Sequence, residues 1–163
     1  MPNVRSSSGS WMRENAAATS LLHQKLNNAL LIYRKKLLEN DLVLDTWPVI
    51  GGFETTSKRE EIQILEYTSE QSYNWHIDTC TDPMSQFHHR STSIILYLTD
   101  DFEGGATKFK MHPKKDFRPK AGRALFFPSN WCFPHCSTPV VSGKKRVAVT
   151  WYYCQDNLVQ VTN

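Results

Sequence analysis

The sequence of 163 residues lacks any apolar run long enough to cross a bilayer, and Met1 to Ser10 is polar where a signal peptide would be apolar. We therefore expect a soluble, cytoplasmic protein with no membrane partner. Cysteine is scarce and shows no CxxC pair or zinc-knuckle spacing. Because thiols of cytoplasmic proteins are normally reduced, we expect no disulfides among the four cysteines, Cys80, Cys132, Cys136 and Cys154.

A strong excess of charge is also lacking. The formal net charge is +3, whereas a nucleic-acid-binding domain is usually more basic, so we expect no nucleic-acid partner. The basic residues do cluster at 34–36, 108–123 and 144–146, and solvated faces are the simplest interpretation of the first two clusters. Hydrophobic and aromatic contents of 40% and 12% indicate a globular chain, and the length fits one domain over 1–163.

The order of elements predicts a mainly β fold with a flanking helix. Apolar residues recur every three or four positions over about 19–39, as in an amphipathic helix that packs by one face (Leu22, Leu26, Ala29, Leu30, Tyr33 and Leu37). Short β-segments follow, separated by proline and glycine, at 61–67, 75–78, 92–98, 107–111, 124–127, 135–141 and 145–153. This spacing is typical of a β-sandwich or a jelly-roll barrel with its core over about 61–153.

A histidine and a carboxylate two positions apart, His76 and Asp78, would point to the same side of a strand and offer one nitrogen and one oxygen to a metal. Such pairs are also common on solvated surfaces. If they are ligands, His135 is the best third, and two histidines with one carboxylate form the facial triad of non-haem iron oxygenases, which leaves three coordination positions open. We rank His88-His89 below His135, and interpret His23 and His112 as surface residues.

A lysine near the end of the chain is the next candidate. Lys145 shares one face of its strand with Val147, Val149 and Trp151, so it would face an apolar interior and need an anionic partner. A dicarboxylate cosubstrate would supply one. Periodicity alone equally allows Lys144 and Arg146 to face inward, or all three to be solvated at a hairpin.

Together, these motifs resemble the prolyl 4-hydroxylase branch of the iron(II)- and 2-oxoglutarate-dependent dioxygenases. In chain order they are Arg5 to Trp11, Tyr67, His76-Ile77-Asp78, Arg90 to Leu98, Gly104-Gly105-Ala106-Thr107-Lys108-Phe109, Pro119 to Ala124, His135, Pro139-Val140, Gly143-Lys144-Lys145 and Trp151. The match covers most of 61–153 and a short leader. It departs from the family pattern in the short leader, in Thr79 to Met84, and at Ser137, which is often apolar.

The resemblance implies a double-stranded β-helix, or jelly roll, packed against an N-terminal helix. It also implies that His76, Asp78 and His135 hold Fe(II). Lys145 would bind the far carboxylate of 2-oxoglutarate, with Tyr67, Tyr97 and Trp151 around the cosubstrate. Arg90 matches an arginine at the mouth of the site, where it would contact substrate. Dioxygen is the second cosubstrate and ascorbate the expected reductant.

The implied reaction is hydroxylation of a C–H bond coupled to oxidative decarboxylation of 2-oxoglutarate to succinate and carbon dioxide, with no general base required. Prolyl residues in a peptide or protein are the first choice of substrate. Free amino acids, other small molecules and a non-catalytic jelly roll that binds metal or peptide are the alternatives, and alkylated bases are disfavoured. Compact members of this branch occur in bacteria and large viruses, so the resemblance also implies a microbial or phage source.

Overall fold

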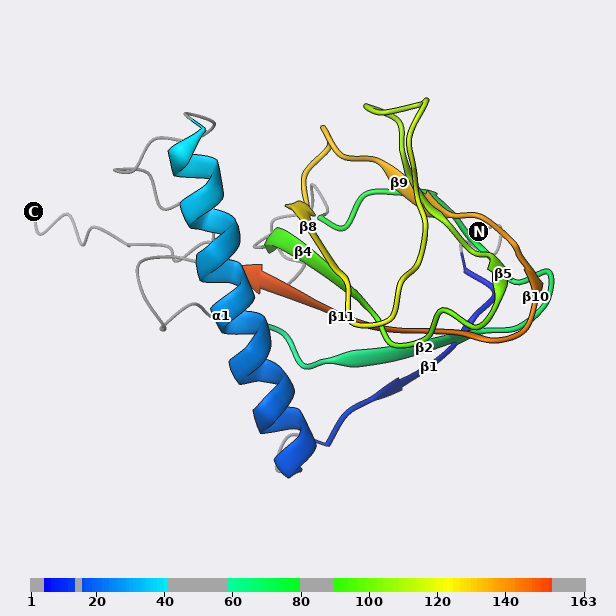
Figure 1. Cartoon of the computed structure of the whole chain (residues 1–163), viewed down its shortest axis with the longest axis horizontal. Helices are drawn as coiled ribbons and strands as arrows, with labels where there is room; N and C mark the ends of the chain where they lie inside the picture. The colour runs from blue at the N-terminus through cyan, green and yellow to red at the C-terminus, as the bar shows by residue number, and fades with distance from the viewer. Residues whose placement is uncertain (1–4, 14–15, 41–58, 80–89, 154–163) are drawn as a thin grey trace, which may run out of the picture.

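The computed structural model describes residues 5–13, 16–40, 59–79 and 90–153. Within these ranges, one helix and eleven strands follow in chain order (Figure 1). Their bounds are β1 Ser8–Trp11, α1 Ala17–Glu39, β2 Gln63–Tyr67, β3 Tyr73–His76, β4 Arg90–Tyr97, β5 Glu103–Gly104, β6 Thr107–Phe109, β7 Asp116–Phe117, β8 Ala124–Pro128, β9 His135–Ser137, β10 Val140–Ser142 and β11 Lys145–Tyr153.

The strands form antiparallel sheets in which most neighbouring strands are far apart in sequence. The larger sheet has the order β1-β2-β11-β4-β8, and a smaller one has the order β3-β9-β6-β7. Strands β10 and β5 pair separately. Because β3 pairs with β9 and β2 with β11, the chain passes repeatedly between the two main sheets, as in a jelly roll. The predicted fold class is confirmed.

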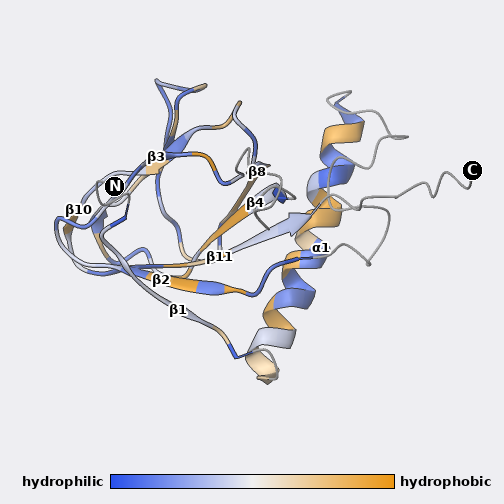
Figure 2. Cartoon of the chain, turned by 180° about the vertical axis from the view of Figure 1, so that it is seen from behind, coloured by the Kyte–Doolittle hydropathy of each residue, from blue (hydrophilic) through white to orange (hydrophobic). Residues whose placement is uncertain are grey.

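The central strand β11 divides the core into two layers. Its alternate residues face opposite sides of the larger sheet. Ala148 and Tyr152 pack with Leu26 and Leu30 of α1, while Val147 and Val149 pack toward the interior with Tyr67. Helix α1 therefore covers one face of the larger sheet (Figure 1), and the second cluster of buried residues lies on the other face. Figure 2 shows hydrophobic and hydrophilic residues alternating in bands along α1, as the periodicity predicts.

All seven predicted β-segments contain strands, and the predicted helix begins two residues earlier than expected, at Ala17. The segment 135–141 is two strands rather than one. The chain leaves β9 at Thr138, whose amide donates to the Ala106 carbonyl. Pro139, which follows, has no amide hydrogen with which to continue the pairing of the strand. Strands β1, β5 and β7 were not predicted.

The predicted strand 75–78 ends early, at His76, so Asp78 lies in a bend beyond β3. The strand ends early because the main chain of Asp78 and Thr79 forms hydrogen bonds toward the larger sheet. The Asp78 carbonyl accepts from Arg90 Nη1 at 3.0 Å, and the Thr79 amide donates to the Ser129 carbonyl at 3.1 Å. These bonds replace those that a continued strand would make to its neighbour.

Other expectations concern cysteine and the membrane. Cys132 and Cys136 are free thiols, while Cys80, Cys154 and the pair His88-His89 lie outside the described residues. In the described part of the chain, no helix has the length and apolarity to cross a membrane.

Candidate metal and cosubstrate site

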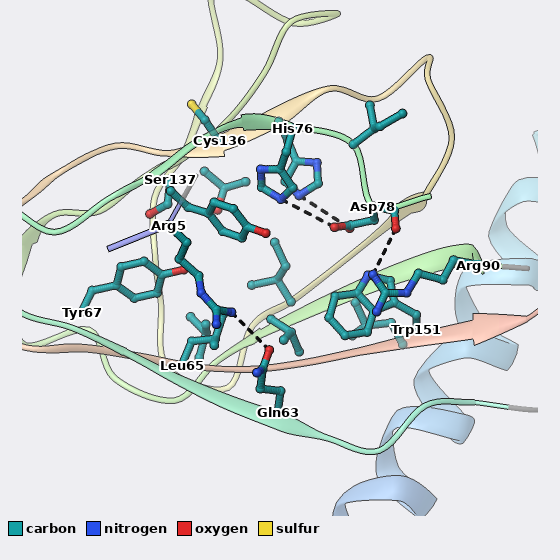
Figure 3. A pocket seen from close by; sticks show the side chains of 18 of the residues that line it. Arg5, Gln63, Leu65, Tyr67, His76, Asp78, Arg90, Cys136, Ser137 and Trp151 are labelled. Carbon is teal, nitrogen blue, oxygen red and sulfur yellow. Dashed lines mark hydrogen bonds and ion pairs between the residues drawn. The ribbon is translucent and has the colours of Figure 1, made fainter. Parts of the chain in front are cut away.

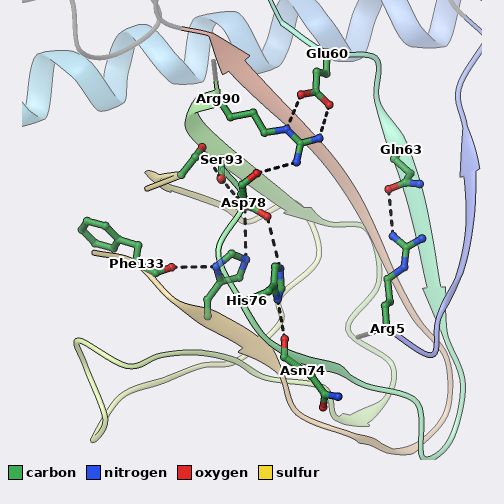
Figure 4. A network of polar contacts seen from close by, with 11 residues as sticks. Arg5, Glu60, Gln63, Asn74, His76, Asp78, Arg90, Ser93 and Phe133 are labelled. Carbon is green, nitrogen blue, oxygen red and sulfur yellow. Dashed lines mark hydrogen bonds and ion pairs between the residues drawn. The ribbon is translucent and has the colours of Figure 1, made fainter. Parts of the chain in front are cut away.

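Three side chains converge at the end of β3 and the start of β9. The ligand atoms of His76, Asp78 and His135 all lie within 4.8 Å of one another. Asp78 Oδ1 is 3.6 Å from His76 Nε2, and Asp78 Oδ2 is 3.6 Å from His135 Nε2 (Figure 4). The register of the smaller sheet produces this arrangement, because His76 and His135 are directly opposite one another across β3 and β9.

Backbone carbonyls determine which imidazole nitrogens carry hydrogen. His76 Nδ1 lies 2.7 Å from the Asn74 carbonyl, and His135 Nδ1 lies 3.1 Å from the Phe133 carbonyl. A carbonyl only accepts, so each Nδ1 donates and, in a neutral ring, each Nε2 presents a lone pair to Asp78. Second bonds of this kind are what orient metal-ligating histidines.

The electrostatics favour a cation between these groups. Burial lowers the pKa of His135 and outweighs the opposing charge of Asp78, which keeps the ring neutral. Burial alone would raise the pKa of Asp78, but His76, His135 and Ser93 together hold it well below its usual range. Two lone pairs and a carboxylate facing one point repel one another unless a cation lies between them, so this donor set fits a divalent metal such as iron.

The triad forms one wall of a cavity of about 560 Å³ that lies between the two main sheets (Figure 3). Tyr67, Ser137, Lys145 and Trp151 also line it. Strands of both sheets contribute, so the cavity is a product of the jelly-roll topology.

Lys145 is the buried cation of this cavity. Its side chain is 2% exposed, and its Nζ donates to the Gly105 carbonyl at 2.8 Å and to Ser137 Oγ at 2.7 Å. Burial lowers its pKa to about 8. No carboxylate of the described residues forms an ion pair with it, so the site fits an anionic ligand.

The two neighbouring basic residues point the other way. Lys144 Nζ and Arg146 Nε lie 3.1 Å and 2.7 Å from the Glu66 carboxylate at the surface. Of the three residues that periodicity left open, only Lys145 therefore enters the cavity.

The other predicted cosubstrate residues lie in different positions. Tyr67 lines the cavity, and burial raises its pKa to about 12, so it stays a neutral hydrogen-bonding group. Trp151 also lines it. Tyr97 does not belong to the described lining. Its hydroxyl lies 2.6 Å from the hydroxyl of Thr107, which does line the cavity.

Arg90 lines the cavity, but its guanidinium has protein partners. Nε and Nη2 donate to the two carboxylate oxygens of Glu60 at 2.5 Å and 2.6 Å, and Nη1 donates to the Asp78 carbonyl. The guanidinium carbon lies 3.6 Å from the centre of the Trp151 ring, in cation–π range (Figure 3). Its role as a substrate contact stays a prediction.

Sequence reasoning missed Tyr73, whose ring stacks on His76 with centroids 3.7 Å apart and an angle of 13°. Residues three apart in a regular strand face opposite sides, but the register shifts between Tyr73 and His76, so both line the cavity. It also missed Arg5 and Gln63, which line the cavity and share a hydrogen bond of 3.3 Å. Arg5 was noticed only as part of the leader motif.

Comparison with known proteins agrees with this geometry. The model of the 2OG-Fe(II) oxygenase superfamily, where 2OG is 2-oxoglutarate, matches residues 62–153. A protein of Acanthamoeba polyphaga mimivirus named "Putative prolyl 4-hydroxylase" is 36% identical over 108 residues, which cover 57% of this chain and 44% of the relative. The chain spans less than half the length of the first curated relatives that it matches.

Two solved structures share the fold. The viral collagen prolyl hydroxylase of Paramecium Bursaria Chlorella virus-1 superposes with a TM-score of 0.66 at 24% identity, covering 93% of this chain and 81% of that one. A prolyl hydroxylase of Trichoplax adhaerens, solved with a peptide fragment of the hypoxia inducible factor oxygen degradation domain, gives 0.65 at 16% identity, with coverages of 94% and 66%.

Proposed function

Because this chain belongs to the 2OG-Fe(II) oxygenase superfamily, we propose that it hydroxylates prolyl residues in a peptide or protein, with Fe(II) and 2-oxoglutarate. The observation that carries the proposal is one cavity with two features. Three acceptor groups converge on a point that fits a metal, and a buried lysine offers positive charge to an anion.

In this proposal His76, Asp78 and His135 hold the iron. When bound, iron and 2-oxoglutarate supply oxidative decarboxylation with dioxygen, which releases succinate and carbon dioxide and hydroxylates a nearby C–H bond. The hydrogen bonds from each Nδ1 fix both imidazoles with Nε2 toward the metal. With three protein ligands, positions remain for the two cosubstrates.

Lys145 binds the far carboxylate of 2-oxoglutarate. The bond it now donates to Ser137 holds Nζ inside the cavity, and an oxygen of the carboxylate would be a stronger acceptor for one of its three hydrogens. The hydroxyl of Tyr67 is a second donor at this end. Tyr97 acts through Thr107, while Trp151 supplies an apolar wall that excludes water.

The choice of a prolyl substrate rests on similarity. The mimivirus relative bears a prolyl 4-hydroxylase name, and the Trichoplax adhaerens protein shares the fold and was solved with a peptide. The alternatives are another hydroxylation substrate, such as a free amino acid, and a jelly roll that binds metal or peptide without turnover.

The test is a peptide library incubated with the protein, Fe(II), 2-oxoglutarate and ascorbate, and read by mass for one added oxygen. We expect oxygen to be added only to peptides that contain proline, with one succinate released per hydroxylation, and neither product from His135→Ala. Oxidation of free amino acids but of no peptide would favour the small-molecule alternative. Iron binding without succinate would favour the non-catalytic one.

A further inference from the structure

Two buried serines form a chain of hydrogen bonds to the carboxylate of Asp78. Ser93 Oγ on β4 donates to Asp78 Oδ2 at 2.6 Å (Figure 4), and Ser129 Oγ, just beyond β8, lies 2.8 Å from Ser93 Oγ. Each serine is 1% exposed. Ser129 lies outside the motifs of the resemblance, and Ser93 belongs to one only as part of the segment Arg90 to Leu98, to which no role at the metal was assigned.

The direction of both hydrogen bonds follows from the number of hydrogens. A carboxylate is an acceptor, so the single hydroxyl hydrogen of Ser93 goes to Asp78. Ser93 can then only accept from Ser129, and the hydroxyl hydrogen of Ser129 is committed to Ser93. The three groups form a one-way chain that ends on Oδ2, with a charge-assisted bond as its last link.

This support matters because Asp78 lies beyond the end of β3. No strand pairing holds it, and its main chain is instead fixed by Arg90 and by the bond between Thr79 and Ser129. The side chain could still rotate, and a freely rotating carboxylate could offer a metal either oxygen or both. The bond from Ser93 to Oδ2 opposes that rotation and leaves Oδ1 facing the Nε2 lone pair of His76 at 3.6 Å.

We propose that Ser93, backed by Ser129, is a positioning residue that makes Asp78 bind the metal through one oxygen. This rests on the proposed function, because it presumes that the triad holds iron. Its consequence for the reaction is that a second carboxylate oxygen does not occupy a position that the cosubstrates need. The hydrogen bond that orients Asp78 therefore comes from the larger sheet, although the two histidine ligands belong to the smaller one.

The experiment measures Fe(II) binding anaerobically by calorimetry in three serine variants. Removing a side chain that hydrogen-bonds to a metal ligand typically weakens metal affinity by about 10- to 100-fold, so we expect the Fe(II) affinity of Ser93→Ala to fall by that factor. Ser129→Ala should lose less, because it acts through Ser93. Ser91→Ala is the matched control. It lies two residues away on the same strand and its hydroxyl donates to the Tyr152 carbonyl at 3.0 Å, so iron binding should be unchanged.

A second readout separates positioning from loss of structure. The visible charge-transfer band of the anaerobic complex with Fe(II) and 2-oxoglutarate depends on the ligands, so it should shift in Ser93→Ala and stay in place in Ser91→Ala. Equal iron affinity in Ser93→Ala and wild type would overturn the inference, as would equal losses in Ser93→Ala and Ser91→Ala. If Ser93→Ala does not fold, Ser129→Ala decides by the same criteria. If wild type itself binds no iron, it is the proposed function that fails.

Discussion

Lys145→Met removes the buried charge and keeps an unbranched side chain of similar length. In wild type, Lys145 Nζ already has two neutral acceptors, Gly105 and Ser137, and an incoming carboxylate adds a charge-assisted bond. Such bonds contribute about 1.5–3 kcal/mol net, so the KM for 2-oxoglutarate should rise roughly 10- to 150-fold. The substituted chain should fold, because a buried unpaired charge, which is costly, has been removed.

The assay is succinate release as a function of 2-oxoglutarate concentration, with Fe(II) and the peptide substrate saturating. Arg146→Met is the matched control, since Arg146 is the next residue but pairs with Glu66 at the surface, and its KM should stay at the wild-type value. A thermal melt without cosubstrate checks that both variants fold. If Lys145→Met left the KM unchanged while Arg146→Met raised it, the assignment of the anion site would be refuted.

The remaining predictions concern pH, an ion pair and the core. Burial lowers the pKa of Lys145 to about 8, so kcat/KM for 2-oxoglutarate should be level below that pH and fall above it as the cation is lost. The free energy of unfolding without cosubstrate should instead rise from about pH 8, because above that pH the unfolded chain retains a proton that the folded chain has lost. Arg90→Leu leaves the carboxylate of Glu60 without its bidentate partner and should lower the free energy of unfolding by about 3–5 kcal/mol in a urea titration, against a smaller loss for Glu60→Gln. Leu30→Ala opens a cavity under α1 and should cost about 2–5 kcal/mol in the same titration, while Fe(II) affinity stays unchanged because α1 packs on the opposite face of the sheet.

The periodic features of the sequence predicted most of the fold. Alternation along β11 correctly put Val147 and Val149 on the same face as Lys145, although it left open which face is inside, and the helical repeat correctly identified Leu26 and Leu30 as part of the packing face of α1. Strand β1 has no such pattern, because all four of its residues are exposed at the edge of the sheet. Its pairing with β2 depends on the rest of the sheet rather than on its own composition.

For the site, the type and order of residues pointed to His76, Asp78, His135 and Lys145, and the structure brings all four to one cavity. What could not be predicted depends on local departures from regular structure. A shift of register turns Tyr73 onto His76, and the end of β3 leaves Asp78 in a bend. The same bend makes the support from Ser93 necessary, and a serine in a β-strand carries no sequence signal of that role.

The central claim is that His76, Asp78 and His135 hold one Fe(II) to which 2-oxoglutarate adds. The most direct measurement is an anaerobic titration of Fe(II) into wild type and the three single alanine variants of these residues, each with 2-oxoglutarate, followed by the visible charge-transfer band. We predict a band that saturates at one iron per chain in wild type and is absent from each variant at the same iron concentration. A band of equal strength in His76→Ala and wild type would contradict the account.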